Sequence, residues 1–451
     1  MNQYPISTKA LTWLEDILSD RFGNKWALLR KGNTIEMKLE GDDKRIIFSE
    51  LSNSLTEANS HQAYTVWDCV QEGWEPVVGR LLPAPGFSEL RTPLIERKNK
   101  DYFINYDILG LTYWMLARVE EIGRSDLDAH GRFAATSSHA FKHGYLERPI
   151  VDEWMHILSQ VIRETWKGIK LKSRKFEVIV SCDVDRPFAY DGTVRQMIRG
   201  GIGDILKRRS LRLAIKNTYA RCKAISSDWN YDPYYKGIEY IMNINEGKNR
   251  KAIFFFMSLN SDLEMDNIIS LNEKRLTEVL RDIDNRGHRI GIHPGYKTYN
   301  DKNNFRLSVQ KLKKKLEREN INQEITIGRQ HYLRWKTPDT ARIYEENKVF
   351  SDSTLGYADM PGFRCGTCIR YNFFDAEEQM SMNLCEQPLI VMECSIISDK
   401  YMGLRTSRKA QDKMINLKEI CKKVGGEFTI LWHNSSLNTK KEKEIYREIC
   451  S

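Results

Sequence analysis

The sequence has no apolar run long enough to cross a membrane. Its longest runs, IFFFM and FEVIV, have the length of strands, whereas a membrane-spanning helix needs about 20 apolar residues. The N-terminus, MNQYPISTKALTWLEDIL, lacks the cationic start and the apolar core of a secretory signal. We therefore expect a cytoplasmic protein.

The sequence also lacks the cysteine spacing of a disulfide framework or a zinc ribbon. Nine cysteines stand at irregular intervals, and an odd number fits free thiols in a reducing compartment. Cys365 and Cys368 form a C-x-x-C motif, CGTC, with no second pair at zinc-ribbon distance and no thioredoxin-like context. We interpret this motif as a structured turn.

Features of a nucleic-acid reader are missing as well, although the formal net charge is +9. There is no aromatic interleaving of basic residues and no finger spacing, so we expect no nucleic-acid partner. Basic residues concentrate between Arg195 and Lys223, where Asp204 is the single acid. This stretch (residues 195–223) could contact an anionic substrate or a membrane surface; the alternative is a solvated basic face.

The length of 451 residues indicates at least two domains. We predict a smaller mixed α+β accessory domain over residues 1–170. It has helices over TKALTWLEDILSDRF, FINYDILGLTYWMLARVEEI and PIVDEWMHILSQVIRETWKGI, and strands over TIEMKL and KRIIFSEL. GRLLPAPGF is predicted to be a loop, because Pro83 and Pro85 remove backbone donors.

Residues 171–451 show a different and regular pattern, in which short apolar runs alternate with amphipathic ones. Seven strand–helix units of this kind predict an α/β domain, a barrel of parallel strands wrapped by helices. The expected helices are SLNEKRLTEVLRDIDNR, NNFRLSVQKLKKKLEREN, DTARIYEENK and RKAQDKMINLKEICKKV. The expected strands are FEVIVS, AIFFFMS, RIGIH, EITIGR, the KVFSDS region, PLIVMEC and FTILWH.

Chemically capable side chains follow four of these strands. Residues just past the carboxyl ends of parallel strands converge on one mouth, where active sites form. We therefore expect one site made from these strand ends. Its candidates are Asp183 and Asp185 after FEVIV, His293 after RIGI, Arg329 and His331 after ITIG, and His433 after FTILW.

The acids and two of the histidines suit a catalytic metal centre. Asp183 and Asp185 are two residues apart, so on an extended segment both can face the mouth, one binding a cation and the other acting as a base. The alternative is an Asp-rich turn that caps the next helix. His293 and His331 with one Asp would leave a position open for water, as in catalytic zinc sites. His288 cannot join them, because on a strand it lies about 16 Å from His293 on the opposite face.

Two further residues have candidate roles beside the metal. His433 could protonate a leaving amine; the alternative is a buried histidine bonded to the backbone. Arg329 could orient Asp183 and keep its pKa low through a charge-assisted hydrogen bond, or form an ordinary surface salt bridge.

The motifs CDVD, GHRIGIHPGY, RQHYLRW, DSTLG and LWHN, in this order, resemble the polysaccharide deacetylases of the NodB-homology type, carbohydrate esterase family four. The likeness runs from about Phe176 to the C-terminus, and RVEE, HGRF and RPIVDEW resemble the N-terminal domain of one bacterial branch. It implies a distorted (β/α)7 barrel that removes acetyl groups from sugars with metal-bound water. The implied roles are Asp183 as base, Arg329 holding the base, His433 as acid, Asp185 and His293 as metal ligands, and Asp352 in a segment lining the groove. Trp432, Tyr296 and Arg364 are further candidate substrate-binding residues.

One position departs from the family pattern. The second metal histidine of the family lies four residues after the first, and Lys297 occupies that place. A protonated lysine would repel a divalent cation. Our hypothesis is that His331 restores the ligand count.

The sequence thus predicts a deacetylase that uses a divalent metal, zinc or else cobalt or nickel, on an N-acetylated sugar in bacterial surface polysaccharide biosynthesis. Two alternatives stay open. A non-catalytic module could keep the groove and bind glycan without turnover. A related metal-dependent amide-bond enzyme could act on a sugar intermediate with a different acyl group.

Overall fold

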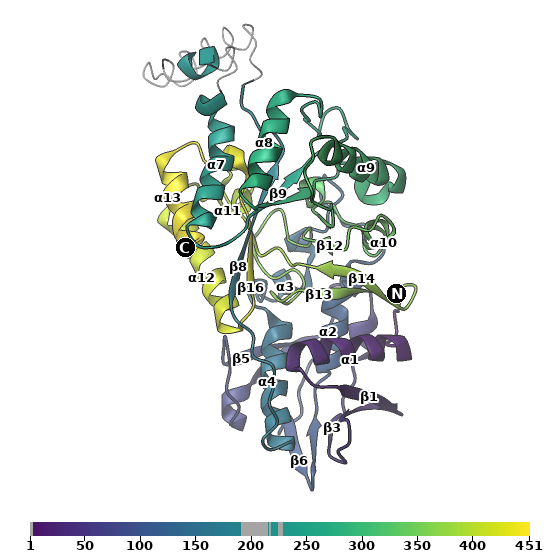
Figure 1. Cartoon of the computed structure of the whole chain (residues 1–451). Coiled ribbons are helices and arrows are strands. Elements are labelled where there is room, and N and C mark those ends of the chain that lie inside the picture. Colours follow the sequence, from purple (N-terminus) through teal and green to yellow (C-terminus); the bar gives the residue numbers. More distant parts are fainter. Residues whose placement is uncertain (1–2, 191–214, 216–217, 224–228) are drawn as a thin grey trace.

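The computed structural model of the chain describes residues 3–190, 215, 218–223 and 229–451 (Figure 1). We use "N-terminal unit" for residues 1–170 and "C-terminal unit" for residues 171–451; the boundary itself stays a prediction. Most of the basic stretch over residues 195–223 lies outside the described residues, so its proposed contacts with an anionic substrate or a membrane stay predictions.

The C-terminal unit is built on one nine-stranded sheet, which is parallel except where β13 meets β14. All seven predicted strands are present. The added hairpin, β13 with β14, was not predicted, because the prediction relied on continuous apolar runs and MSMNLCE has none. In sheet order the strands are β13 (Tyr371–Asp375), β14 (Met380–Glu386), β12 (Ser351–Asp352), β11 (Ile327–Gly328), β10 (Arg289–Ile292), β9 (Ile253–Phe256), β8 (Glu177–Val184), β16 (Glu427–Leu431) and β15 (Val391–Met392).

The prediction of an α/β unit with a parallel sheet is confirmed, but the closed barrel is not seen. The sheet ends at β13 and β15, and within the described part of the chain no strand pairing joins these two. The hydrogen-bonded ladder is therefore open. Its parallel order still brings the carboxyl ends of β8, β10, β11 and β16 to one edge.

Amphipathic helices cover this sheet. In the view of Figure 1, α7, α12 and α13 lie on one side of the strands and α9 and α10 on the other. Of the described helices, none is long and apolar enough to cross a membrane. Four helices match predicted segments: α8 (Lys274–Asn285), α9 (Lys302–Arg318), α10 (Asp339–Glu346) and α12 (Arg408–Lys423); α7 (Pro233–Glu246), α11 (Glu393–Ile397) and α13 (Lys440–Ile449) are additional.

The N-terminal unit contains a five-stranded sheet, a two-stranded ribbon and the predicted helices. Helix α2 is shorter than expected: it begins at Ile108, because the side chain of Asp107 caps it by accepting from the backbone N–H of Gly110. The sheet order is β1 (Trp26–Lys31), β2 (Thr34–Leu39), β3 (Arg45–Phe48), β7 (Asp101–Ile104) and β6 (Ile95–Lys98); the ribbon is β4 (Tyr64–Asp68) with β5 (Leu81–Pro85), and the main helices are α1 (Thr8–Phe22), α2 (Ile108–Leu116), α3 (His139–Lys142) and α4 (Ile150–Thr165).

The loop predicted over GRLLPAPGF is wrong, because it contains strand β5. The carbonyl of Pro83 accepts from Trp154 Nε1 at 2.8 Å, and that of Pro85 accepts from Tyr106 Oη at 3.1 Å. Both prolines therefore turn their backbone edge away from β4, where a missing N–H removes no ladder bond.

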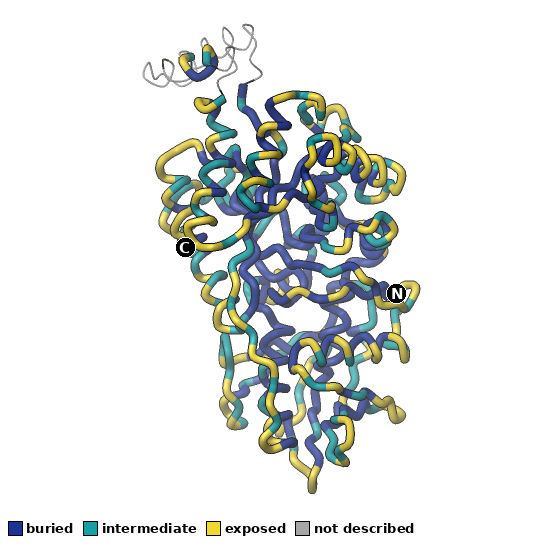
Figure 2. The backbone as a smooth tube through the Cα atoms, in the orientation of Figure 1, coloured by how far each residue is buried: buried dark blue, intermediate teal, exposed yellow. Residues whose placement is uncertain are grey.

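The two units share one hydrophobic core. Trp13 on α1 donates from Nε1 to the carbonyl of Asn372 at 2.8 Å, and its ring lies 5.1 Å from that of Phe374 on β13. Buried residues run without interruption from one unit to the other (Figure 2). Cys365 and Cys368 are free thiols, and CGTC forms a turn whose Gly366 carbonyl accepts from the N–H of Val151 on α4.

A buried ion cluster also joins the units. Glu121 accepts from Arg118 at 2.8 Å and from Arg364 of the C-terminal unit at 2.7 Å, with all three side chains at most 3% exposed. Burial by itself would raise the pKa of Glu121, but the two arginines outweigh it and lower the pKa to about 2. The carboxylate therefore stays charged at every physiological pH.

We expect Glu121→Gln to lower the free energy of unfolding at pH 7 by about 3–5 kcal/mol, since the buried Arg364 loses its carboxylate partner and Arg118 keeps only Glu120, at 3.6 Å. The contribution of Glu121 is fully present above its unfolded pKa near 4.5 and is lost as the pH falls through about 2. Denaturant unfolding measures the effect. The exposed Glu164, paired with Lys167, gives the control Glu164→Gln, expected to change stability by less than about 0.5 kcal/mol. Equal effects of the two substitutions would contradict the prediction.

Candidate metal centre

The strand ends of the C-terminal unit meet at a cavity of about 290 Å³. Asp183 lies in β8 with Asp185 just after it, and His293 follows β10. His331 comes three residues after β11, and His433 two residues after β16. The structure thus brings together the residues that the strand-end pattern predicted. The cavity is lined by Arg132, Asp183, Asp185, Arg186, Met257, Met265, Asn267, His293, His331, Tyr332, Leu333, Met392, Cys394, Tyr401 and His433.

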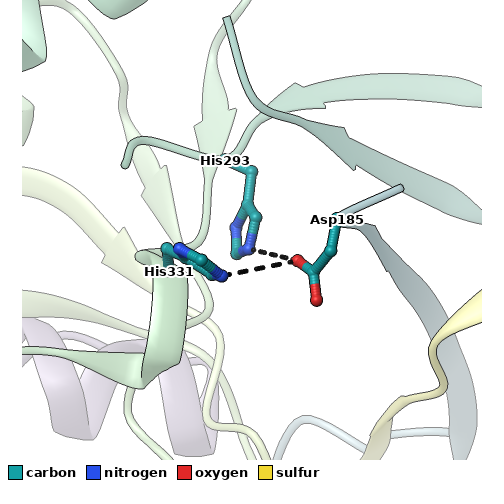
Figure 3. A group of neighbouring side chains, drawn as sticks. All are labelled: Asp185, His293 and His331. Carbon is teal, nitrogen blue, oxygen red and sulfur yellow. Dashed lines mark ion pairs between the residues drawn. The ribbon is translucent and has the colours of Figure 1, made fainter. Parts of the chain in front are cut away.

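Asp185, His293 and His331 form a group that could hold a metal ion (Figure 3). Oδ1 of Asp185 lies 3.3 Å from Nε2 of His293 and 3.7 Å from Nε2 of His331. Ligand atoms bound at about 2.0–2.2 Å to one tetrahedral ion lie roughly 3.3–3.6 Å apart. Oδ1 of Asp185 is also buried, and no donor meets it with hydrogen-bond geometry. An unsatisfied buried oxygen between two imidazole nitrogens fits a divalent cation.

Both imidazoles are held with Nε2 toward this point. Nδ1 of His293 donates to the carbonyl of Arg329 at 2.6 Å, and Nδ1 of His331 donates to Oδ1 of Asp266 at 2.8 Å. With the proton on Nδ1, each Nε2 keeps its lone pair for a metal. Burial would raise the pKa of Asp266, but His331 and Ser261 lower it to about 2, so the orienting carboxylate is ionised.

The charges of the three candidate ligands support one another. Burial alone would raise the pKa of Asp185, but His293, His331 and His433 outweigh it and lower the pKa well below its usual range. Burial alone would lower the pKa of His293, but Asp183 and Asp185 raise it. In the absence of a metal, a proton can bind Nε2 of His293, the same nitrogen that would bind the cation. Protons and the cation therefore compete for this nitrogen.

His288 and Lys297 lie outside this group. Nδ1 of His288 accepts from the N–H of Ala252 at 3.0 Å, and the residue is buried away from the three candidate ligands. The Lys297 side chain is 61% exposed and pairs with Asp262 at 2.9 Å. The lysine therefore faces solvent, and the expected repulsion of a cation is absent.

Asp183 sits beside the metal group with one oxygen held in place. Oδ1 accepts from Nη1 of Arg329 at 3.0 Å, while Oδ2 lies 3.9 Å from Nε2 of His293. Arg329 is fully buried and also donates to Ser181 and Ser353. The arginine therefore has one fixed position, and Oδ2 of Asp183 is the oxygen turned toward the centre.

His433 lies beside the Asp185 carboxylate of this group. Its Nδ1 donates to Oε1 of Glu393 at 2.8 Å, and its Nε2 lies 3.8 Å from Oδ2 of Asp185. Burial would lower the pKa of His433, but Glu393 and the two aspartates raise it to about 10. The imidazole is therefore protonated at neutral pH and can act as a proton donor.

None of the four predicted substrate-binding residues lines the cavity. Asp352 is buried and accepts from the N–H and hydroxyl of Thr354. Trp432 is buried and donates to the carbonyl of Ser436, while Arg364 belongs to the inter-unit ion cluster. Tyr296 is half-buried, with its ring 5.3 Å from that of Tyr332, which does line the cavity.

Several residues of the site were missed in the sequence. Glu393 directly follows β15, so the strand-end rule could have found it. Asp266 lies in an irregular segment after β9, where no spacing marks it. Arg132 comes from the N-terminal unit, and its contribution to the cavity depends on a long-range contact.

The turn after His331 is strained. Tyr332 and Leu333 have φ values of 63° and 54°, in the left-handed region that non-glycine residues seldom adopt. Each such residue costs of order 1–3 kcal/mol, and strain of this kind clusters at functional sites. Both residues line the cavity.

Comparisons with known proteins give a family of unknown function (DUF7033) over residues 13–167, which is less than half of the chain. Curated proteins gave no match. Among solved structures, the chain is similar to a proposed polysaccharide deacetylase from Mycobacterium smegmatis, with 16% identity and a TM-score of 0.39 over 62% of this chain and 85% of that one. It is also similar to a mutant of a CE4 family pseudoenzyme with restored enzymatic activity (10% identity, TM-score 0.30, 63% and 66% covered) and to PuuE allantoinase (10%, 0.37, 63% and 84%). These names include the family that the motifs predicted, but at such TM-scores the activity has to follow from the site.

Proposed function

We propose that the chain is a metal-dependent hydrolase that removes the acetyl group from an N-acetylated sugar, in bacterial surface polysaccharide biosynthesis. One observation carries the proposal. The metal-binding group of Asp185, His293 and His331 is contacted by a held carboxylate, Asp183, at 3.9 Å from His293, and by a protonated imidazole, His433, at 3.8 Å from Asp185. A base and an acid next to a metal are what amide hydrolysis requires.

The residues of the site have separate roles in this proposed hydrolysis. Asp185, His293 and His331 would hold the ion, and two nitrogens with one carboxylate oxygen suit zinc, with cobalt or nickel as substitutes. The ion, when bound, supplies an acidified water and polarises the acetyl carbonyl. Asp183 takes the proton from the attacking water, and Arg329 holds this carboxylate in position through its hydrogen bond to Oδ1. His433 gives its Nε2 proton to the leaving nitrogen, and Glu393 stabilises the imidazolium.

Chelation tests the metal requirement. We expect acetate release from N-acetylated oligosaccharides to stop when the protein is stripped with a chelator and to resume on adding zinc, cobalt or nickel. Released acetate and newly formed sugar amine should appear in equal amounts. Acetate release that persists in the stripped protein would contradict a metal-dependent hydrolase. Sugar binding without turnover in metal-loaded protein would instead favour a non-catalytic glycan-binding module.

A panel of acyl groups tests the choice of acetyl. Formyl, acetyl and larger N-acyl sugars differ only in the group that must fit beside Asp183 and His433. A clear preference for a group other than acetyl would identify a related amide-bond enzyme with the same machinery.

A further inference from the structure

Residues 128–132 of the N-terminal unit form a tight loop that lies against the metal centre. Oδ1 of Asp128 accepts from the N–H groups of His130 and Arg132, and the N–H of Gly131 donates to the Asp128 carbonyl. Gly131 has φ 68°, and a Cβ there would lie 3.1 Å from Nη2 of Arg334 in the C-terminal unit. The loop is therefore closed by its own hydrogen bonds and approaches the other unit closely.

Arg132 connects this loop to the turn after the third candidate ligand. Its Nε and Nη2 both contact Oδ2 of Asp128 at 2.7 Å, and its Nη1 donates to the carbonyl of Tyr332 at 2.9 Å. The residue is 6% exposed. Asp128 thus fixes the guanidinium, and the guanidinium holds the backbone of the strained turn that begins at His331.

The same loop also reaches the segment that follows His293. Nδ1 of His130 is hydrogen-bonded to the hydroxyl of Tyr296 at 3.1 Å, and its ring lies 4.8 Å from that of Tyr332. Tyr296 comes three residues after His293, and Tyr332 one residue after His331. One loop of the N-terminal unit therefore braces both segments that carry histidine ligands.

We propose that the N-terminal unit is part of the metal centre, with Arg132 as the positioning residue that keeps His331 in ligand geometry. The left-handed conformation of Tyr332 and Leu333 is unfavourable in isolation, and the Arg132 hydrogen bond to the Tyr332 carbonyl opposes its relaxation. Asp266 in the C-terminal unit fixes the ring of His331, and Arg132 in the N-terminal unit holds the backbone of the next residue, Tyr332. This inference rests on the metal centre of the proposed function but does not depend on the reaction.

Metal affinity is the readout for this role. We expect Arg132→Gln to weaken zinc or cobalt binding, measured by calorimetry, about 10–100-fold, the range seen when residues that orient a ligand are lost. The visible absorption of the cobalt-loaded protein should change as the geometry of the site changes. Arg132→Lys keeps a donor for Tyr332 but loses the fork on Asp128, so an intermediate affinity is expected. Glycine adopts φ 63° freely, so Tyr332→Gly should restore part of the affinity in the Arg132→Gln background.

Arg21 provides a matched control, since it is a buried arginine that also joins the units, through Asp152 and Thr367, without lining the cavity. Arg21→Gln should lower the thermal midpoint and leave metal affinity unchanged. A folded Arg132→Gln protein with wild-type affinity and cobalt spectrum would overturn the proposal. Where Arg132→Gln does not fold, Arg132→Lys and Asp128→Asn decide in the same way. A wild-type chain that binds metal but releases no acetate would overturn the proposed function and leave this inference intact.

Discussion

Replacing Asp183 by asparagine is expected to lower kcat for acetate release about 10²–10⁴-fold, the contribution of a general base, while the protein still binds its metal. Oδ1 of Asp183 accepts a hydrogen bond from Arg329, and Asp183 is not one of the three candidate metal ligands, Asp185, His293 and His331. The amide has the same shape as the carboxylate but cannot accept the proton of the attacking water. Steady-state kinetics with a metal titration on the same preparation measures both quantities.

Two further variants serve as controls for Asp183→Asn. Asp185→Asn should lose metal together with activity, because Oδ1 of Asp185 is the oxygen nearest both imidazoles. Asp262→Asn should leave both unchanged, because Asp262 pairs with Lys297 and does not line the cavity. If Asp183→Asn lost metal as completely as Asp185→Asn, Asp183 would be a ligand, and the assignment of the base would fail.

The second large effect is expected from His331→Ala, which should weaken metal binding by more than about 100-fold. This exceeds what is usual for residues that only orient a ligand, because the substitution removes a donor atom. Nε2 of His331 lies 3.7 Å from Oδ1 of Asp185, and Asp266 holds the ring in place from its other side. Metal content after dialysis and binding calorimetry both report the loss.

Lys297→Ala is the matched control for His331→Ala, since Lys297 occupies the position at which the resembled family carries its second histidine. The lysine is exposed and paired with Asp262, so its removal should leave the metal affinity unchanged. Unchanged metal stoichiometry in His331→Ala would remove this histidine from the centre. A large loss of metal affinity in Lys297→Ala would show that Lys297 contributes to metal binding.

Much of this centre could be predicted from the sequence, because its signals are local. Short apolar runs locate β8, β10, β11 and β16, and parallel order fixes which end of each strand carries the functional residue. Asp183, Asp185, His293, His331 and His433 all follow from that rule, and the structure brings them to one cavity. The rejection of His288 rested on the pitch of a strand and is consistent with its contact to Ala252.

What could not be predicted depends on contacts between distant parts of the chain. No spacing links Asp266 to His331, or Arg132 to Tyr332, although each pair is in direct contact. The open end of the sheet depends on where the β13–β14 hairpin packs. Strand β5 was missed for a different reason: its prolines are compatible with a ribbon whose outer edge bonds to side chains.

The core shared by the two units also limits how the gene can diverge. Trp13 and Phe374 lie 361 positions apart in the sequence, yet their rings are in contact, and Trp13 also donates to the carbonyl of Asn372, two residues before that phenylalanine. A change of size on one side has to be matched on the other, so the two halves of the chain are expected to be inherited as a pair. Recombination that exchanged one half for that of a distant homologue would break this fit.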